Sequence, residues 1–284
     1  GKKRREVNFK MGMKGLIASV YIGIQVESNW TKKPLYLLYL FASPIASIFT
    51  VIIIYGMLGG NLKSDLFYFA LFGSLFYYFL ADTFFNTAFS VIDDREHYRV
   101  LKYIIVSKTK YFTYTLGRGV GKAILTLISI TMNLLWIIPV LKIHISFQLF
   151  PLIAGLSVGF VGALGLALAF SGYYLLSIRS ETSLMDVLFG GLFLISGAMF
   201  SPTILPGFLK TLATYFPLTS TIEMLRFAFF GKHLSQFLAG TPFSQFFGLF
   251  LMTNLISFVV GFVLFELALK SAIKKGYLDI TTAF

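Results

Sequence analysis

Two polar side chains lie one helical turn apart inside a long apolar stretch. Asp82 and Asn86 stand between Leu66 and Ile92, a run rich in Phe and Leu. If this run crosses a bilayer, the carboxylate costs about 2.5 to 3.5 kcal/mol even on insertion scales, which makes it a functional-site hypothesis by default. The alternative is structural, a hydrogen bond to Asp82 from Asn86 or from a neighbouring helix. The pair is therefore a candidate intramembrane polar site.

One segment imitates a phosphate-binding loop but fails on two counts. Gly117 to Lys122 reads GRGVGK, with one residue too few between the outer glycines, and Ala123 stands where the loop needs Ser or Thr. It also leads into an apolar run instead of following a strand, so we interpret it as close helix packing. The three histidines lie in separate segments without zinc-ligand spacing. We expect a chain that is not an enzyme and holds no metal and no cofactor of its own.

The composition does not fit a water-facing surface. The 284 residues are 57% hydrophobic and 13% charged, and the mean hydropathy is +0.80. Soluble domains carry about twice that share of charged residues. With no cysteine, the chain also lacks disulfides, thiolate metal sites and cysteine nucleophiles. These features predict an all-α polytopic membrane protein.

Six apolar runs approach or exceed the roughly 20 residues that a spanning helix needs. They lie at Leu35 to Leu58, Leu66 to Ile92, Val120 to Leu141, Leu149 to Ile178, Leu184 to Leu205 and Phe243 to Leu269. Residues 35–284 are therefore predicted to form a single domain of six transmembrane helices. Pro44 interrupts the first run, which is tolerable in lipid where neighbouring helices satisfy the freed carbonyl.

The basic residues predict the orientation of these spans. Nineteen of the 24 Lys and Arg residues fall on the side that holds both termini and the loop after the second span. By the positive-inside rule that side is cytosolic. We expect a multi-pass protein of the cell membrane with both termini in the cytosol. The net charge of +12 then reflects topology and contact with lipid headgroups, and nucleic-acid binding is not expected.

Residues 1–34 are predicted to form a cytosolic basic tail and an interfacial helix. Apolar residues recur there at helical spacing, with Lys10 and Lys14 on the other face; they are Phe9, Met13, Leu16, Ile17, Val20 and Ile24. This pattern is typical of an amphipathic helix that lies in the membrane interface. An unstructured basic tail is the alternative.

The cytosolic loop at about residues 93–118 mixes charged, aromatic and apolar residues. It is either a solvated charged loop or a docking surface for a cytosolic partner, since aromatic anchors and salt bridges suit such a surface. The candidate docking residues are Glu96, His97, Tyr98, Arg99, Val100, Leu101, Lys102 and Tyr103.

The outer segment at about residues 201–238 is too apolar for a solvated loop. Pro202, Pro206 and Pro217 divide it into pieces too short to span a bilayer. We predict a re-entrant helical hairpin between the fifth and sixth spans, because such pieces persist where protein satisfies their backbone. A lid of outer-leaflet amphipathic helices is the alternative.

Glycines recur along the predicted fourth span. Gly155, Gly159, Gly162 and Gly165 have spacings that let another helix approach closely. Packing within one subunit and a seam between two subunits are both consistent with this pattern.

These segments resemble the membrane subunits of type 2 ATP-binding-cassette (ABC-2) exporters. Ser196 to Arg226 is similar to the family's Ser-Gly step, prolines, Pro-Leu-Thr step and Glu-x-x-Arg ending, which fall here on Gly197, Pro202, Pro206, Pro217, Glu223 and Arg226. The loop after the second span is also similar, with Arg99, Lys102 and Lys108 in place of the family's usual glycine, acid and proline. The order of parts matches along nearly the whole chain.

The resemblance implies the transmembrane subunit of an ATP-driven exporter, which forms the path of the substrate. It implies a dimer with a second copy of this chain or a similar permease. A separate cytosolic nucleotide-binding subunit would hold ATP and Mg²⁺ and dock near Glu96 to Tyr103, while the outer hairpin would act as a gate. The alternative is a stand-alone ion-coupled carrier or a non-transporting scaffold, although such carriers usually show interrupted helices in both halves of the chain.

Overall fold

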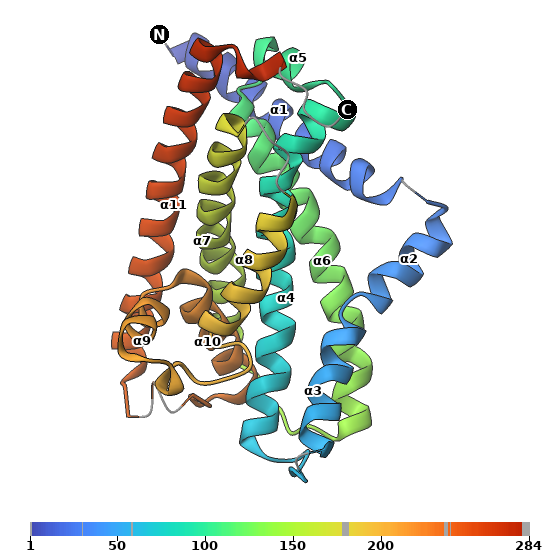
Figure 1. Cartoon of the computed structure of the whole chain (residues 1–284), viewed down its shortest axis with the longest axis vertical. Helices are drawn as coiled ribbons and strands as arrows, with labels where there is room; N and C mark the ends of the chain where they lie inside the picture. The colour runs from blue at the N-terminus through green and yellow to red at the C-terminus, as the bar shows by residue number, and fades with distance from the viewer. Residues whose placement is uncertain are drawn as a thin grey trace.

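The computed structural model describes residues 2–29, 31–57, 59–177, 182–235, 238 and 240–279, with the backbone alone for residues 2–12, 182–186 and 279. The long elements in these ranges are all helices, as predicted. They run side by side in one bundle, and α1, α5 and the last turns of α11 lie at the same end of it (Figure 1). We call this the α5 end.

Five helical segments within the described ranges are long and apolar enough to cross a membrane. They are α2 (Lys33–Ala42) with α3 (Ile45–Met57), α4 (Asp65–Ile92) with the π-helical η1 (Asp93–His97), α6 (Tyr111–Leu141), α7 (Leu149–Leu176) and α11 (Phe243–Lys275). The first segment bends between α2 and α3 at Pro44, whose ring removes a backbone donor.

The remaining elements are shorter or lie at the ends of the bundle. They are α1 (Lys2–Ser28), α5 (Leu101–Val106), α8 (Thr182–Ile195), η2 (Pro202–Ile204), α9 (Gly207–Thr214), α10 (Pro217–Phe230) and η4 (Tyr277–Asp279).

The predicted fifth span, Leu184 to Leu205, is wrong as a single spanning helix. α8 has 14 residues and ends at Ile195, which gives it about 21 Å of length against a hydrocarbon core of roughly 30 Å. The helix stops because Gly197 adopts a left-handed backbone conformation, with φ at +68°. The chain completes this part of the bundle with η2, α9 and α10 instead of one continuous span.

α10 is a short helix packed among the spans. Apart from Phe227 and Phe230, all of its residues are buried, and it packs against α4, α7 and α11. Figure 1 shows it in the half of the bundle away from α5. Pro217 begins the helix at a position where no backbone donor is needed. The proline-divided segment therefore forms short helices as predicted, and the last of them is internal.

The glycines of α7 pack against helices of the same chain. A Cβ atom on Gly159 would lie 2.1 Å from the Thr221 Cγ2 of α10, and one on Gly162 would lie 1.8 Å from the Asn254 Oδ1 of α11. A Cβ atom on Gly261 of α11 would lie 1.9 Å from the carbonyl oxygen of Gly165. The small residues thus bring α10 and α11 against α7 within one subunit.

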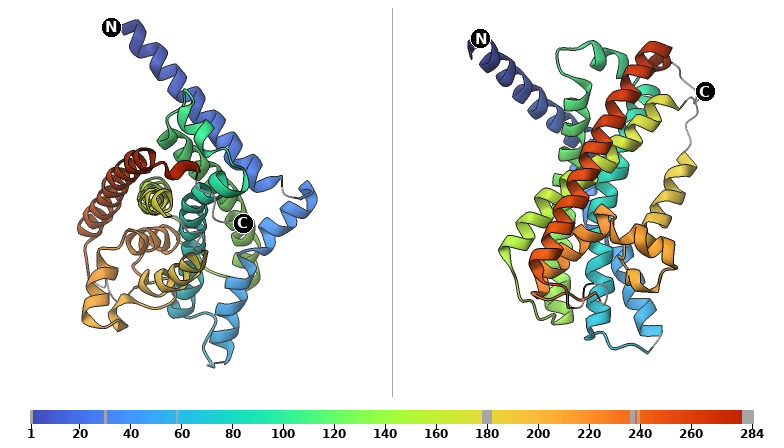
Figure 2. Two further views of the ribbon diagram at one scale, coloured as in Figure 1. Left: turned by 45° about the horizontal axis from the view of Figure 1, so that its top comes forward. Right: turned by 90° about the vertical axis from the view of Figure 1, so that its left-hand side faces the viewer.

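α1 projects from the α5 end at an angle to the spans (Figure 2). It meets α6 where the GRGVGK segment lies, since a Cβ atom on Gly117 would fall 2.3 Å from the Ser19 Cβ. This contact confirms the helix-packing interpretation of that segment. Met13, Ile17 and Tyr21 stay exposed along α1, so its location at the membrane interface remains a prediction. The side chains of Lys2, Lys3, Arg4, Arg5, Phe9 and Lys10, and all of Arg179, lie outside the described residues.

Candidate functional site

The loop at the α5 end exposes most of the predicted docking residues. The exposed ones are His97, Tyr98, Arg99, Lys102 and Tyr103. Leu101 turns into the core and Val100 is half-buried. Arg99 has φ at +54°, a left-handed conformation that is uncommon outside glycine. This residue separates η1 from α5 and lets the chain turn between them.

Glu96 is buried and belongs to the base of this loop. Its Oε1 lies 3.1 Å from Nη2 of the buried Arg95. Arg95 Nη1 also donates to the carbonyl oxygens of Tyr174, at 3.2 Å, and Ser177, at 2.8 Å. These carbonyls end α7, where helical carbonyls lack backbone donors and a cation is favourable. The Arg95 and Glu96 pair therefore ties the loop to the end of α7.

A second buried ion pair ties the loop to α6. Arg118 Nη1 donates to Asp94 Oδ1 at 3.0 Å, and the Tyr114 hydroxyl donates to the same oxygen at 3.2 Å. Asp94 and Arg118 are both buried. Removing one partner of such a pair leaves an uncompensated buried charge, so η1 and the start of α6 are held as one unit.

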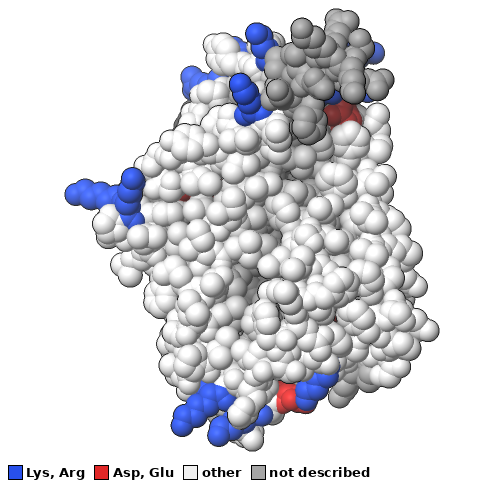
Figure 3. Space-filling model, turned by 180° about the vertical axis from the view of Figure 1, so that it is seen from behind, with Lys and Arg blue, Asp and Glu red and all other residues white. Residues whose placement is uncertain are grey.

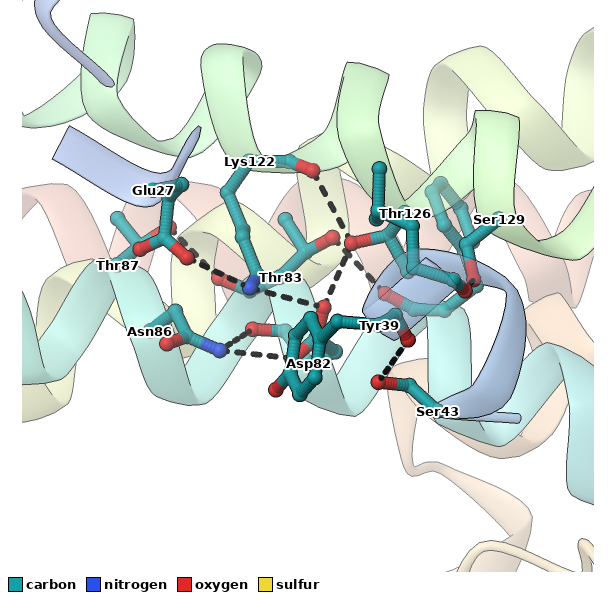
Figure 4. Close-up of polar contacts among 12 residues, drawn as sticks. Glu27, Tyr39, Ser43, Asp82, Thr83, Asn86, Thr87, Lys122, Thr126 and Ser129 are labelled. Carbon is teal, nitrogen blue, oxygen red and sulfur yellow. Dashed lines mark hydrogen bonds and ion pairs between the residues drawn. The ribbon is translucent and has the colours of Figure 1, made fainter. Parts of the chain in front are cut away.

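Asp82 lies at the centre of a polar network between three helices (Figure 4). Asn86 Nδ2 donates to Asp82 Oδ1 at 2.8 Å, and Thr126 Oγ1 of α6 donates to Oδ2 at 2.6 Å. Lys122 Nζ lies 3.4 Å from Asp82 Oδ2 and 2.9 Å from Oε2 of Glu27 on α1. Asp82 therefore accepts hydrogen bonds from Asn86 on its own helix and also from Thr126 on a neighbouring helix, which are the two alternatives of the structural interpretation.

The network continues along α6 toward α2. Ser129 Oγ donates to the Leu40 carbonyl oxygen, and Asn133 Nδ2 donates to that of Phe41 at 3.1 Å. These carbonyls lie near the end of α2, before the Pro44 bend, where backbone acceptors lose their helical donors. We call Lys122, Thr126, Ser129 and Asn133 the polar seam of α6. The seam joins α6 to α1, α2 and α4 through side-chain hydrogen bonds.

Arg226 joins α10 to the turn after α8 and to α4. Its guanidinium pairs with Glu223 and is fully buried. Nη2 donates to the carbonyl oxygens of Gly197, at 3.0 Å, and Ala198, at 2.6 Å. Nε donates to the Phe69 carbonyl oxygen at 3.1 Å. Arginine suits this role because its rigid fork can serve several acceptors at once.

Gly73 of α4 makes room for this arrangement. A Cβ atom there would lie 1.7 Å from Arg226 Nη2 and 2.0 Å from the Ala198 carbonyl oxygen. Pro202 lies beside the Gly197 turn, whereas Pro206 is exposed at the start of α9. Four predicted hairpin residues, Gly197, Pro202, Glu223 and Arg226, thus meet around one turn, while Pro206 lies apart and Pro217 begins α10.

His233 follows α10 and packs between aromatic rings. Its ring centroid lies 4.9 Å from that of Phe227 and 5.0 Å from that of Phe246. Burial lowers the pKa of His233 below its usual 6.5. The imidazole is therefore neutral near pH 7 and acts as an aromatic packing residue.

A family model for ABC-2 family transporter proteins matches residues 60–270. The chain belongs to this family. The matched range covers α4 through most of α11, and so includes the loop at the α5 end, the polar seam and the Arg226 cluster. No curated protein sequence gives a significant match.

As an ABC-2 family protein, the chain is a multi-pass membrane component of a transporter. Membrane proteins of this family partner with ATPase subunits and are typically non-catalytic. The described residues contain no group of three or more His, Asp or Glu that could hold a metal ion. The buried charges of this ABC-2 protein instead join its helices.

Sequence reasoning missed several of these joining residues. From the sequence, Arg95, Arg118 and Lys122 contribute to the charge distribution that predicts orientation, and nothing marks them or Glu27 as members of ion pairs. One feature of the sequence could have indicated a polar helix face: Arg118 and Lys122 lie one helical turn apart at the edge of an apolar run. Their acidic partners are 24 or more residues away in the chain, and such pairs have no local signature.

Proposed function

We propose that this ABC-2 protein is the permease subunit of an ATP-driven exporter. In this proposal its helices form the path of the substrate, and a separate cytosolic subunit binds and hydrolyses ATP. The family match over residues 60–270 carries the proposal. Both termini and the α5 end face the cytosol, in agreement with the distribution of Lys and Arg.

The ATPase subunit docks on the exposed residues of the loop at the α5 end. His97, Tyr98, Arg99, Lys102 and Tyr103 offer aromatic anchors and charges on one short segment. The base of the loop supports this role. Arg95 binds carbonyls at the end of α7, and Asp94 binds Arg118 of α6. A displacement of the loop is therefore passed to α4, α6 and α7 together.

The segment from α8 to α10 acts as the gate away from the cytosol. Arg226 links α10 to α4 and to the turn at Gly197, so a movement of α4 is transmitted to this segment. Pro202, Pro206 and Pro217 keep its helices short, which allows them to move as separate units. The working exporter contains two permease chains, either two copies of this one or this one with a similar permease.

Copurification with a cytosolic Walker-motif ATPase tests this proposal. The double variant Tyr98→Ala with Tyr103→Ala should lose most of the bound ATPase, because it removes both aromatic anchors of the proposed docking surface. Both side chains are more than half exposed, so the fold should be retained. Tyr215→Ala is the matched control, since Tyr215 is 57% exposed on the hairpin. Glu96→Ala is a poor probe, because it would also break the buried pair with Arg95.

The outcome that counts against the proposal is specific. If the double variant binds the ATPase as the control does, the docking surface lies elsewhere. If purified wild-type chain binds no ATPase and carries substrate in vesicles without ATP, the chain is a stand-alone carrier.

A further inference from the structure

An apolar cavity of about 310 Å³ lies between α4, α6, α7 and α10. Its floor consists of buried residues of α4 and α10, namely Phe76, Phe79, Leu225 and Phe229. Its rim consists of half-buried residues of α6 and α7, among them Leu127, Ile138 and Leu156. Thr131 is the single polar residue among the described residues that line it. Such a surface gains nothing from water and favours an apolar ligand.

The cavity has the depth of one bilayer leaflet. Along α6 its lining runs from Leu127 to Ile138, which at 1.5 Å per residue is about 16 Å. The hydrocarbon core of a bilayer is roughly 30 Å thick, so this length is close to half of it. Because Ile138 lies near the end of α6 remote from α5, the cavity occupies the leaflet on the far side from α5.

The cavity opens beside exposed apolar faces of two helices that are long enough to span a membrane. Leu135 on α6 is 71% exposed, and Ile128 on α6 and Ile153 on α7 are also exposed. α6 and α7 both have the length and hydropathy of membrane spans. In Figure 3 a broad uncharged zone separates the charged side chains at the bottom of the molecule from those higher up. In a membrane, the molecules next to such an opening are acyl chains.

We propose that this cavity binds one acyl chain of a membrane phospholipid. The bound chain lies along α6 with its methylene groups against the four floor residues. Two of these, Leu225 and Phe229, belong to α10, and Arg226 on the same helix holds the Gly197 turn. An acyl chain in the cavity therefore packs against the helix that the proposed gate uses. This site goes beyond the proposed function and requires neither the ATPase subunit nor an exported substrate.

Quenching of tryptophan fluorescence by brominated acyl chains tests the site. The chain alone, with Trp30→Phe and Trp136→Phe to remove its two native tryptophans, is reconstituted into vesicles of dibrominated phosphatidylcholine. Phe79→Trp places the reporter on the cavity floor. Phe84→Trp is the matched control, because Phe84 is a buried phenylalanine of the same helix that does not line the cavity. We expect at least twofold stronger quenching of the reporter at residue 79 than of the reporter at residue 84.

A second substitution separates entry into the cavity from general contact with lipid. Leu156→Trp, made in the otherwise unchanged chain, fills the rim of the cavity. Native mass spectrometry should then show the loss of one tightly held phosphatidylcholine per chain. Leu255→Trp on the exposed face of α11 should retain it. Equal quenching of the two reporters, or equal retention of lipid by these two variants, would overturn the proposal. Both measurements, fluorescence quenching and lipid retention, use the chain without an ATPase subunit. Their results therefore do not depend on whether an ATPase copurifies, and the test is independent of the proposed function.

Discussion

At the scale of single residues, Arg226 carries the largest concentration of buried polar contacts described in the chain. It serves Glu223 and three backbone carbonyls from two other segments. A charge in this position is favourable only while all of its partners are in place. This dependence makes the residue a sensitive test of the structure.

Arg226→Ala should destabilise the protein by about 3 to 5 kcal/mol, because Glu223 would remain as an unpaired buried charge. Arg226→Lys should recover little, since an ammonium group cannot reach the same carbonyls as a planar fork. Thermal unfolding in detergent measures both. Lys232→Ala is the control: its pair with Asp65 is exposed and should contribute about 0 to 1 kcal/mol. A similar loss for the variants at residues 226 and 232 would contradict the structure.

Gly73→Ala should also destabilise the protein, though less than the loss of Arg226. The added methyl group would lie 1.7 Å from Arg226 Nη2, so the guanidinium or the Ala198 carbonyl must move. We expect a loss of about 1 to 3 kcal/mol from overpacking, seen as a lower unfolding midpoint. Gly248→Ala on α11 has open space around it and should be neutral or stabilise by up to about 1 kcal/mol. A neutral result at Gly73 would mean that α4 and the Gly197 turn lie farther apart.

At the scale of elements, the attachment of α1 to the bundle depends on small residues and one bridging lysine. Gly117 and Gly121 of α6 bring the α1 backbone close, and Lys122 spans from Glu27 of α1 to Asp82 of α4. Through these contacts α1 can follow the movements of α4 and α6. The interaction is therefore both steric and electrostatic.

Gly121→Val should detach α1 from α6 without unfolding the spans. A Cβ atom at Gly121 would lie 2.8 Å from the Val20 carbonyl oxygen, and the further methyl groups need more space. Hydrogen exchange should become faster in residues 13–28 and stay slow in α7 and α11. Gly56→Val on α3, where the surroundings are open, is the control. Unchanged exchange in α1 would show that this contact does not hold the helix.

At the scale of the whole molecule, the distribution of Lys and Arg predicts the orientation in the membrane. Lys63 and Lys108 stand at opposite ends of the α4 segment and its loop. The first belongs to the side with few Lys and Arg residues and the second to the side with many. The protein has no cysteine, so labelling of each introduced thiol can be measured without a contribution from native thiols of the chain.

Lys63→Cys should react with a membrane-impermeant maleimide in intact cells, and Lys108→Cys should react only after the membrane is opened. The physical reason is that cytosolic loops retain Lys and Arg during insertion. Labelling of both variants in permeabilised cells is the control for reactivity. The reverse pattern would place the termini and α5 outside and remove the basis for docking a cytosolic ATPase there.

The sequence by itself determined which segments are helical and apolar. Runs such as Leu66 to Ile92 are long enough to predict a transmembrane helix without knowledge of their neighbours. The reason is that in lipid the backbone groups of a spanning helix must form their hydrogen bonds within that helix. The prolines at residues 202, 206 and 217 likewise predicted short helices, since their effect is local. The glycine spacing of α7 predicted a close approach, but not by which helix.

Tertiary structure decided which side chains meet and where the fifth predicted span ends. Glu27, Asp82 and Lys122 come from three helices, and Arg226 reaches a carbonyl at Phe69 that lies 157 residues earlier in the chain. α8 ends at Ile195, just before the left-handed turn at Gly197 that Arg226 holds through the Gly197 carbonyl oxygen, whereas its apolar composition alone would allow a longer helix. The spacing of residues along the chain shows which side chains share a helix face. Which side chains of different helices meet depends on how the helices pack, and no short sequence pattern encodes that packing.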